Sequence, residues 1–267
     1  MGEKFTVEQI REFWTQQSRE HGLSSDASWS DHRVIELEIR ELLPWLADGD
    51  RVLDVGCANG YSTVQLASQK RVTIRGLDYI PEMIEQARLR FADPKLVNTL
   101  AGTVEFGVGD IMALREPSDA YDKVVVIRVV INLGNWTNQQ QALRECARLV
   151  KPGGLFLLSE ATLQGWQSLN RFRREWGLPD IAMPAFNLYL DQDQVVEALS
   201  PQLELVELSN FSSTYFVATR VLKPLLAQAL QAKVDVASPD MEWNRWWAQL
   251  PAWGDYGTQK LFVFRKV

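Results

Sequence analysis

Two acidic residues and two glycines stand at the ends of two successive apolar runs. Asp54 belongs to the first run, Gly56 and Gly60 follow it at once, and Asp78 closes the second run. The glycines allow the backbone to approach a ligand closely, and a helix that opens at Tyr61 directs its free N–H groups to the same place. A carboxylate at the end of the second run can accept hydrogen bonds from both hydroxyls of a ribose. This pattern predicts a binding site for an adenosine-like ligand.

The spacing of the glycines argues against a ligand that carries phosphates. A dinucleotide-binding turn has the pattern G-x-G-x-x-G, whose middle glycine lets the backbone touch a pyrophosphate. In this chain the turn reads G-x-x-x-G, with Ala58 at the middle position. The lysine and hydroxyl of a phosphate-binding loop are also missing. We therefore expect an adenosine derivative without phosphates.

The turn and the second strand together resemble the motifs of the class I S-adenosylmethionine (SAM) methyltransferases. The residues that carry the resemblance are Asp54, Gly56, Asn59, Gly60 and Asp78. It implies that SAM is the cofactor, that Asp54 holds the turn and the methionine ammonium group, and that Asp78 binds the ribose. The backbone around Gly56 and Cys57 would contact the methionine portion. Cys57 and Ala58 depart from the commonest form of the motif, G-C-G-x-G, and an α/β turn without special function is the alternative.

The same resemblance implies contacts with the adenine ring. Gly109, Asp110 and Ile111 follow the third predicted strand. Asp110 would accept a hydrogen bond from the adenine amino group, while Ile111 packs on the ring. Tyr79 and Met83, beside the ribose carboxylate, would enclose the adenine. The alternatives are a helix cap for Asp110 and simple core packing for Tyr79 and Met83.

A charged residue interrupts the apolar end of the fourth predicted strand. Arg128 is costly to bury without a partner, and Glu160, at the end of the neighbouring strand, is the expected partner. The resemblance places the methyl group and its acceptor at this point. Arg128, Asn132 and Glu160 are therefore candidate catalytic residues, and Arg128 is also a candidate cofactor contact. A purely structural Arg–Glu pair is an equal alternative.

Residues 1–48 are expected to form a helical lid over the cofactor. Trp14, Trp29 and Arg33 are candidate cofactor contacts, and the resemblance implies that an arginine near position 33 pairs with the methionine carboxylate. His32 is a candidate general base, because imidazole changes its charge near neutral pH. The alternatives are a solvated helix charge for Arg33 and a surface histidine for His32.

Strands and helices alternate in the centre of the chain, which predicts a parallel sheet with right-handed crossovers. The resemblance implies an α/β, Rossmann-like sheet of seven strands, with the seventh antiparallel and helices on both faces. We expect a single domain over residues 1–267, with the SAM-binding core in 49–161 and cap insertions over the acceptor site in 162–190 and 210–258. Strands are expected at 51–55, 72–78, 104–108, 123–130, 155–158, 203–208 and 260–264. Two further helices are expected to start at Thr137 and at Ser238-Pro239-Asp240.

The first insertion supplies candidate substrate-binding residues, Asn170, Arg173, Asn187 and Tyr189. Arginine and asparagine side chains can hold an anionic or sugar-bearing acceptor, and a solvated helix face is the alternative. The second insertion is rich in tryptophan. These aromatic residues are either a wall for a sugar or lipid, or the small core of the cap.

Composition bounds the possible partners. Of the 267 residues, 46% are hydrophobic and 23% charged, as in ordinary globular proteins. The net charge of −6 argues against affinity for the nucleic-acid backbone. Cys57 and Cys146 suit a reducing compartment, and no carboxylate–histidine cluster has the spacing of a metal site. With neither a signal peptide nor an apolar run of membrane-spanning length, a cytoplasmic monomer or homodimer without a metal is expected.

These features predict SAM-dependent transfer of a methyl group to an oxygen of a small-molecule or sugar (glycan) acceptor, with nitrogen or carbon as alternative acceptor atoms. A hydroxyl acceptor would need a base to take its proton. One rival is a catalytically silent SAM-binding or scaffold protein, which would keep the same turn. The other is a nicotinamide-dependent oxidoreductase, which would require Ala58 to tolerate a pyrophosphate.

Overall fold

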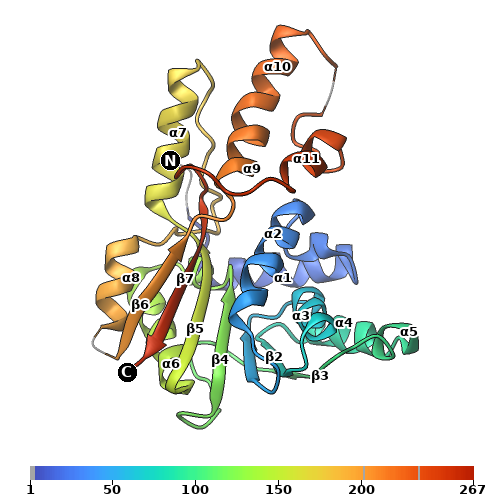
Figure 1. Cartoon of the computed structure of the whole chain (residues 1–267), viewed down its shortest axis with the longest axis vertical. Coiled ribbons are helices and arrows are strands. Elements are labelled where there is room, and N and C mark those ends of the chain that lie inside the picture. Colours follow the sequence, from blue (N-terminus) through green and yellow to red (C-terminus); the bar gives the residue numbers. More distant parts are fainter. Residues whose placement is uncertain (1–3, 201, 234) are drawn as a thin grey trace.

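A computed structural model describes residues 4–200, 202–233 and 235–267 of the chain. Its centre is a seven-stranded sheet with the order β3-β2-β1-β4-β5-β7-β6 (Figure 1). The strands are β1 (Arg51–Val55), β2 (Thr73–Asp78), β3 (Thr103–Val108), β4 (Tyr121–Ile127), β5 (Val150–Ala161), β6 (Leu203–Ser209) and β7 (Gln259–Lys266). β1 to β5 pair in parallel, and β7 runs antiparallel to both β5 and β6. The predicted sheet, including the antiparallel seventh strand, is confirmed.

Both faces of the sheet are covered, because its central strands are apolar on both sides. Val52 of β1 packs with helices on one face, whereas the next residue, Leu53, packs with helices on the other. The first face carries α2 (His32–Leu42), α3 (Tyr61–Gln69) and α4 (Pro81–Phe91), and the second carries α6 (Trp136–Leu149) and α8 (Gln192–Leu199). The strand order changes direction at β1, between β2 and β4. A crevice at the carboxyl ends of these strands is the expected ligand site in an open α/β sheet.

The turn between β1 and α3 needs glycine at both ends. Gly56 and Gly60 have φ angles of 77° and 74°, which L side chains rarely adopt. A Cβ on Gly60 would lie 2.7 Å from Phe106 Cζ and 3.1 Å from Ala87 Cβ. Gly60 therefore lets α3 pack closely on β3 and α4.

Several predicted boundaries differ in the structure; β5, for example, spans Val150–Ala161 where only 155–158 was expected. β4 ends at Ile127, three residues earlier than expected, because Arg128 has a φ of +56° and turns the chain into the short helix η3 (Val130–Asn132). The cap of α6 is Asn135, whose side chain accepts from the N–H of Asn138, and not Thr137. The last helix, α11 (Glu242–Trp247), begins after the predicted Ser238-Pro239-Asp240 start.

The N-terminal segment is fixed to the glycine turn. It consists of α1 (Val7–His21), which ends at Gly22, followed by the short helix η1 (Ser25–Ala27). The side-chain amide of Asn59 donates to the carbonyl oxygens of Gly22 and Ser24, at 2.8 and 2.7 Å. Asn59 is buried, so these bonds hold the end of α1 against the turn.

The remaining helices lie beyond the carboxyl ends of the parallel strands (Figure 1). They are α7 (Leu163–Glu175), α9 (Ser213–Val217), the π-helix η4 (Ala218–Leu222), α10 (Lys223–Ala229) and α11, while α5 (Pro94–Val97) and η2 (Leu43–Trp45) are short connections elsewhere. We call the upper layer formed by α7, α9, η4, α10 and α11, with the loops next to them, the cap.

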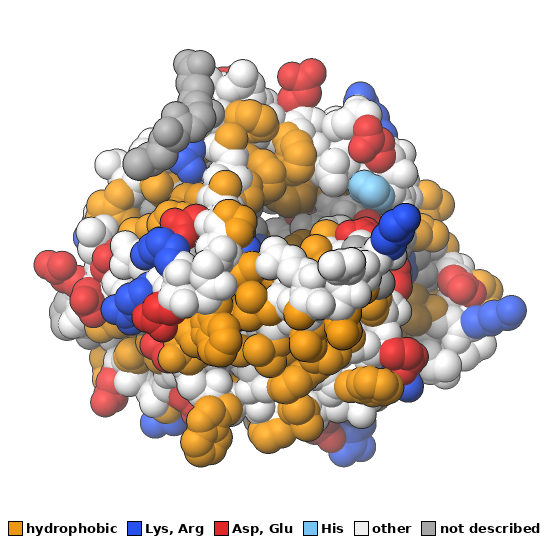
Figure 2. Space-filling model, turned by 90° about the horizontal axis from the view of Figure 1, so that it is seen from above, with side chains coloured by type: hydrophobic (Ala, Val, Ile, Leu, Met, Phe, Trp, Pro, Cys, Tyr) orange, Lys and Arg blue, Asp and Glu red, His pale blue; other side chains and the backbone are white. Residues whose placement is uncertain are grey.

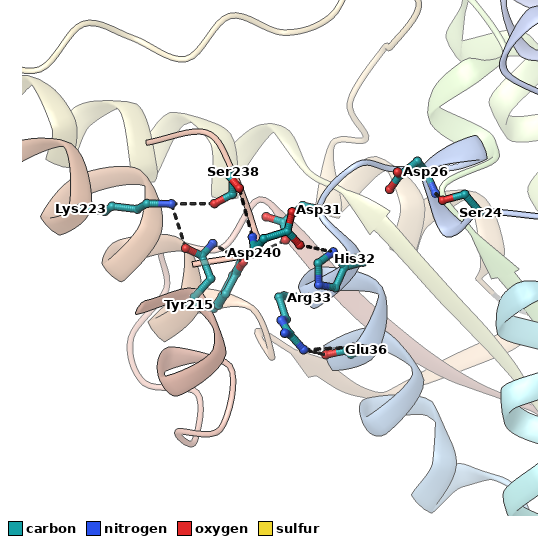
Figure 3. Close-up of polar contacts among 11 residues, drawn as sticks. Ser24, Asp26, Asp31, His32, Arg33, Glu36, Tyr215, Lys223, Ser238 and Asp240 are labelled. Carbon is teal, nitrogen blue, oxygen red and sulfur yellow. Dashed lines mark hydrogen bonds and ion pairs between the residues drawn. The ribbon is translucent and has the colours of Figure 1, made fainter. Parts of the chain in front are cut away.

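A buried polar chain joins the start of α2 to this cap (Figure 3). Asp31 accepts from the Tyr215 hydroxyl at 2.9 Å and from Arg220 Nη2 at 2.5 Å. Asn244 Nδ2 donates to the Tyr215 oxygen at 2.8 Å, and Lys223 Nζ donates to Asn244 Oδ1 at 2.9 Å. Partly satisfied buried polar groups are costly, so this connected set fixes how the cap sits on α2.

Replacement of Gly60 by alanine should destabilise the fold more than replacement of Gly49. Gly49 also has a positive φ, 93°, but an added Cβ would meet no atom within 4 Å. Gly49→Ala thus reports backbone strain alone, about 1 kcal/mol, whereas Gly60→Ala adds a clash that we expect to cost about 1–3 kcal/mol more. Denaturant unfolding of both variants measures the difference, and equal losses would contradict the packing role of Gly60.

Candidate cofactor and acceptor site

A cavity of about 240 Å³ opens at the carboxyl ends of β1, β2 and β4, beneath α1. The sequence predicted much of its lining. The candidate residues that line it are Trp14, Asp54, Gly56, Cys57, Asn59, Asp78, Tyr79, Met83, Asp110, Ile111, Arg128 and Asn132. Gly60 and Gly109 do not line it. Gly60 packs on Phe106, and Gly109 lies against Leu77 and donates its N–H to the Asp78 carbonyl oxygen.

Asp78 is held in a fixed orientation at the end of β2. Its two carboxylate oxygens accept the backbone N–H groups of Ala58 and Ile80, each at 2.9 Å. Burial raises the pKa of Asp78 to about 6, against the opposing effect of these two bonds. A carboxylate oxygen has lone pairs beyond those used by the amides, so Asp78 retains acceptor capacity toward the cavity.

Asp54 is the second buried carboxylate of this cavity. It accepts a hydrogen bond from the Thr63 hydroxyl at 2.6 Å. Burial raises the pKa of Asp54 to about 6, the bond from Thr63 lowers it, and the charge of Asp78 raises it. Over the described residues, no lysine or arginine forms an ion pair with either carboxylate.

The residues that line this cavity fit SAM. The cofactor carries a sulfonium and an ammonium group, and a cavity with two buried, uncompensated carboxylates favours cations. Gly56 leaves the necessary room, since a Cβ there would lie 2.1 Å from Val129 Cγ2. Asp110 lies on the cavity wall and also accepts the N–H of Met112 at 2.9 Å. No helix begins there, so the alternative of a helix cap for Asp110 is wrong.

A second cavity, of about 330 Å³, adjoins the first. Trp14, Ser28, Arg128 and Asn132 line both cavities, so the two meet at these four side chains. The second cavity also contains Trp29, which was predicted to contact the cofactor. Figure 2 looks onto this end of the molecule and shows a recess bordered by hydrophobic side chains.

The predicted partner of Arg128 is wrong. Arg128 forms its ion pair with Glu38 of α2, and its guanidinium lies 5.1 Å from the centre of the Trp29 ring. Glu38 is buried and also accepts hydrogen bonds from Ser159 and Gln259, at 2.6 and 2.8 Å. Burial lowers the pKa of Arg128 to about 10, so the side chain remains charged at neutral pH.

Glu160 has a different role from the one expected. It is buried, lines neither cavity, and one of its oxygens accepts the N–H groups of Val129 and Val130 at 2.8 and 2.6 Å. Burial raises the pKa of Glu160 to about 8, although these bonds and the charge of Arg128 lower it. Glu160 thus fixes the turn after β4, and its position argues against contact with an acceptor.

His32 and Arg33 also lie outside both cavities. Figure 3 shows the contacts that they make instead. His32 Nδ1 is 3.9 Å from Asp240 of the cap, and Arg33 pairs with Glu36 at 2.9 Å. The first turn of α2 faces the cap and not the cofactor cavity. The roles of general base and of methionine-carboxylate partner therefore do not fit these two residues.

The four predicted substrate residues divide into two pairs. Asn187 and Tyr189 line the second cavity. Asn170 is occupied by the backbone of Ile181, from which it accepts and to which it donates. Arg173 donates to the carbonyl oxygens of Pro179 and Arg220. Asn170 and Arg173 therefore hold the cap together and are not acceptor contacts.

Besides Trp14, which was predicted, helix α1 supplies wall residues that were not predicted from the sequence. Val7, Ile10, Arg11 and Trp14 face the first cavity, whereas Phe13, Trp14, Gln17 and His21 face the second. Residues three, four or seven positions apart share one face of a helix, so the spacing of positions 14, 17 and 21 was a signal. Asp26, Phe186 and Gln259 also line the second cavity, and no local pattern marks them.

Fold and site together resemble those of the class I SAM-dependent methyltransferases, and the site fits SAM as a cofactor. Residues 52–154 match the family model described as a methyltransferase domain. Over 117 residues the chain is 30% identical to methyltransferase GfsG of Streptomyces halstedii, covering 44% of this chain and 40% of that protein. Over 122 residues it is 29% identical to the 27-O-demethylrifamycin SV methyltransferase of Amycolatopsis mediterranei, covering 46% and 42%.

The structural match covers more of the chain than the sequence matches do. The crystal structure of the [4+2]-cyclase SpnF superposes with a TM-score of 0.63 at 20% identity, over 99% of this chain and 98% of that one. At that identity the match concerns the fold alone. The chain spans about two fifths of the length of the curated relatives. The described residues hold no helix long and apolar enough to cross a membrane.

Replacement of Asp54 by asparagine should make the ligand-free protein more stable at neutral pH. A carboxyl group with a raised pKa in the folded state stabilises the fold fully below about pH 4, and this contribution is lost as the pH rises through about 6. Asparagine stays neutral and can still accept from Thr63. We expect equal stability near pH 4 and a gain on the order of 2 kcal/mol at pH 7.5, measured by denaturant unfolding.

The exposed Asp48 gives the matched control for this prediction. Hydrogen bonds from Arg71 lower the pKa of Asp48, so Asp48→Asn should bring no gain at pH 7.5. A stability of Asp54→Asn that stays parallel to the parent at every pH would refute the assigned burial of this charge.

Proposed function

We propose that the chain transfers the methyl group of SAM to a hydroxyl oxygen of a small molecule. The observation that carries the proposal is the pair of adjoining cavities, one lined by two uncompensated carboxylates and both lined by Trp14, Ser28, Arg128 and Asn132. Methyl transfer requires a cofactor and an acceptor to meet in line, away from water. The rifamycin relative, whose printed name describes transfer to an oxygen, supports an oxygen acceptor.

The residues of the first cavity would hold SAM. Asp78 would accept from the ribose hydroxyls and Asp54 would face the methionine ammonium group, while Asp110 and Ile111 would lie at the adenine. When bound, SAM supplies a methyl group on a positively charged sulfur, which leaves as a neutral thioether. Because the leaving group needs no proton, this chain has to align the acceptor, exclude water and remove one proton from the acceptor hydroxyl.

His21 is the side chain best suited to take that proton. The titratable groups that line the second cavity are His21, Asp26, Arg128 and Tyr189. Arg128 is charged and paired with Glu38, and burial raises the pKa of Tyr189 to about 12, so both are protonated at neutral pH. A carboxylate such as Asp26 is a weak base, whereas histidine exchanges a proton near neutrality.

Calorimetry with S-adenosylhomocysteine, NAD and NADP tests the cofactor half of the proposal. We expect S-adenosylhomocysteine to bind and both nicotinamide cofactors to fail, because Ala58 occupies the position where a dinucleotide site needs glycine. Binding of NAD with no response to S-adenosylhomocysteine would overturn the proposal. A silent SAM-binding protein would bind S-adenosylhomocysteine but turn over no acceptor.

The two histidines of the chain provide a matched pair for the catalytic half. His21→Gln should lower kcat/KM for a hydroxyl acceptor about 10²- to 10⁴-fold, because the proton loses its acceptor. His32→Gln, outside both cavities, should leave it unchanged. Release of S-adenosylhomocysteine over a panel of phenols and aliphatic alcohols measures the rate, and calorimetry checks that both variants keep their affinity for the product. Equal activity of the two variants would remove His21 from the mechanism.

A further inference from the structure

Two amide oxygens without a hydrogen-bond partner among the residues that the structure describes belong to side chains that line the second cavity. They are Asn132 Oδ1 and Asn187 Oδ1. The Asn132 amide is oriented by its Nδ2, which donates to the Arg128 carbonyl oxygen at 2.7 Å. Leaving a buried acceptor unpaired is unfavourable, so these oxygens are suited to receive hydrogen-bond donors from a ligand.

Aromatic side chains line much of the second cavity. The rings of Phe13 and Phe186 stack at 4.5 Å between centres, and Trp14 meets Phe186 edge-on at 5.8 Å. Trp29 lies on the same cavity, with its face under Arg128. Aromatic walls favour flat apolar ligands, which they contact face-on or edge-on.

The charges at the second cavity do not favour an anionic ligand. Its arginine, Arg128, is already neutralised by Glu38, and Asp26 adds a carboxylate to the wall. Arg173, which was a candidate for holding an anionic acceptor, bonds instead to backbone carbonyls, and its neighbour Arg174 pairs with Asp180. An acidic ligand would therefore lose its hydration without gaining a free cation.

We propose that the second cavity binds an uncharged, flat, largely apolar ring compound that carries two hydrogen-bond donors. One donor, the reacting hydroxyl, pairs with Asn132 where the two cavities meet, and the other pairs with Asn187. This inference rests on the proposed function. In the transfer, the hydroxyl oxygen would bond to the methyl carbon while the carbon–sulfur bond breaks and its electron pair stays on sulfur. The hydroxyl proton would leave its hydrogen bond to Asn132, pass to His21 and then to water.

Binding of naphthalene derivatives to the protein saturated with S-adenosylhomocysteine tests the proposal without turnover. The probes are the dihydroxynaphthalene isomers, 2-naphthol, 6-hydroxynaphthalene-2-sulfonate and methyl glucoside. We expect one or more dihydroxynaphthalenes to bind, 2-naphthol to bind about tenfold more weakly for the lost hydrogen bond, and the sulfonate and the glucoside not to bind. Tryptophan fluorescence and calorimetry both report the binding.

Asn187→Leu separates the polar contact from the aromatic wall. It should reduce the affinity for the best dihydroxynaphthalene to that for 2-naphthol and leave 2-naphthol itself unaffected. Asn98→Leu, on an exposed asparagine, is the control. Should the leucine variant no longer bind S-adenosylhomocysteine, Asn187→Ser replaces it, because serine keeps a polar group but withdraws the amide oxygen.

The outcomes distinguish this inference from the function on which it rests. Binding of S-adenosylhomocysteine with no binding of any dihydroxynaphthalene, or with a preference for the sulfonate or the glucoside, overturns the acceptor class and leaves the methyltransferase proposal intact. Failure of the parent protein to bind S-adenosylhomocysteine overturns the proposed function itself. An unchanged affinity of Asn187→Leu for the dihydroxynaphthalene overturns the role of Asn187.

Discussion

The burial of two carboxylates without a cation is the constraint on which the site depends. Asp54 and Asp78 end adjacent parallel strands, and the strand order brings both to the crevice where β1 separates β2 from β4. Burial disfavours both charges, and the fold compensates only in part, through the Thr63 hydroxyl and two backbone amides. A cationic ligand would supply the remaining compensation, so stability of the empty protein and affinity for the cofactor oppose each other at these two positions.

The turn after β4 is also unfavourable on its own, and two carboxylates stabilise it. Arg128 adopts a positive φ, which is unfavourable for a residue with a side chain. Glu160 accepts the next two backbone N–H groups, and Glu38 pairs with the guanidinium. The turn is thereby held from both sides, by a strand and by α2. Because Arg128 and Asn132 line both cavities, this fixed turn determines where the first cavity meets the second.

Features that depend on residues close together in the sequence could be predicted, whereas contacts between distant segments could not. The glycine turn and Asp78 were predictable, since a strand, a turn and the next strand end form one local unit. The partner of Arg128 was not, because Glu38 lies ninety positions away on a helix whose rotation depends on tertiary packing. The same rotation places His32 beside Asp240 of the cap and leaves Arg33 paired with Glu36 of its own helix. Asn170 and Asn187 have the same chemistry in the same insertion, and only the fold shows that one serves the backbone and the other the cavity.

The single helix α1 covers both cavities. The α1 residues that line the first cavity and those that line the second have Trp14 in common. The C-terminal end of α1 is fixed by the Asn59 amide at the glycine turn. At the same time Asp31, just beyond η1, is fixed to the cap through Tyr215 and Arg220. The segment between these two anchors carries Asp26, Ser28 and Trp29, all on the second cavity. Any displacement of α1 would therefore change the walls of both cavities together, because Trp14 belongs to both and the anchored segment follows the helix directly.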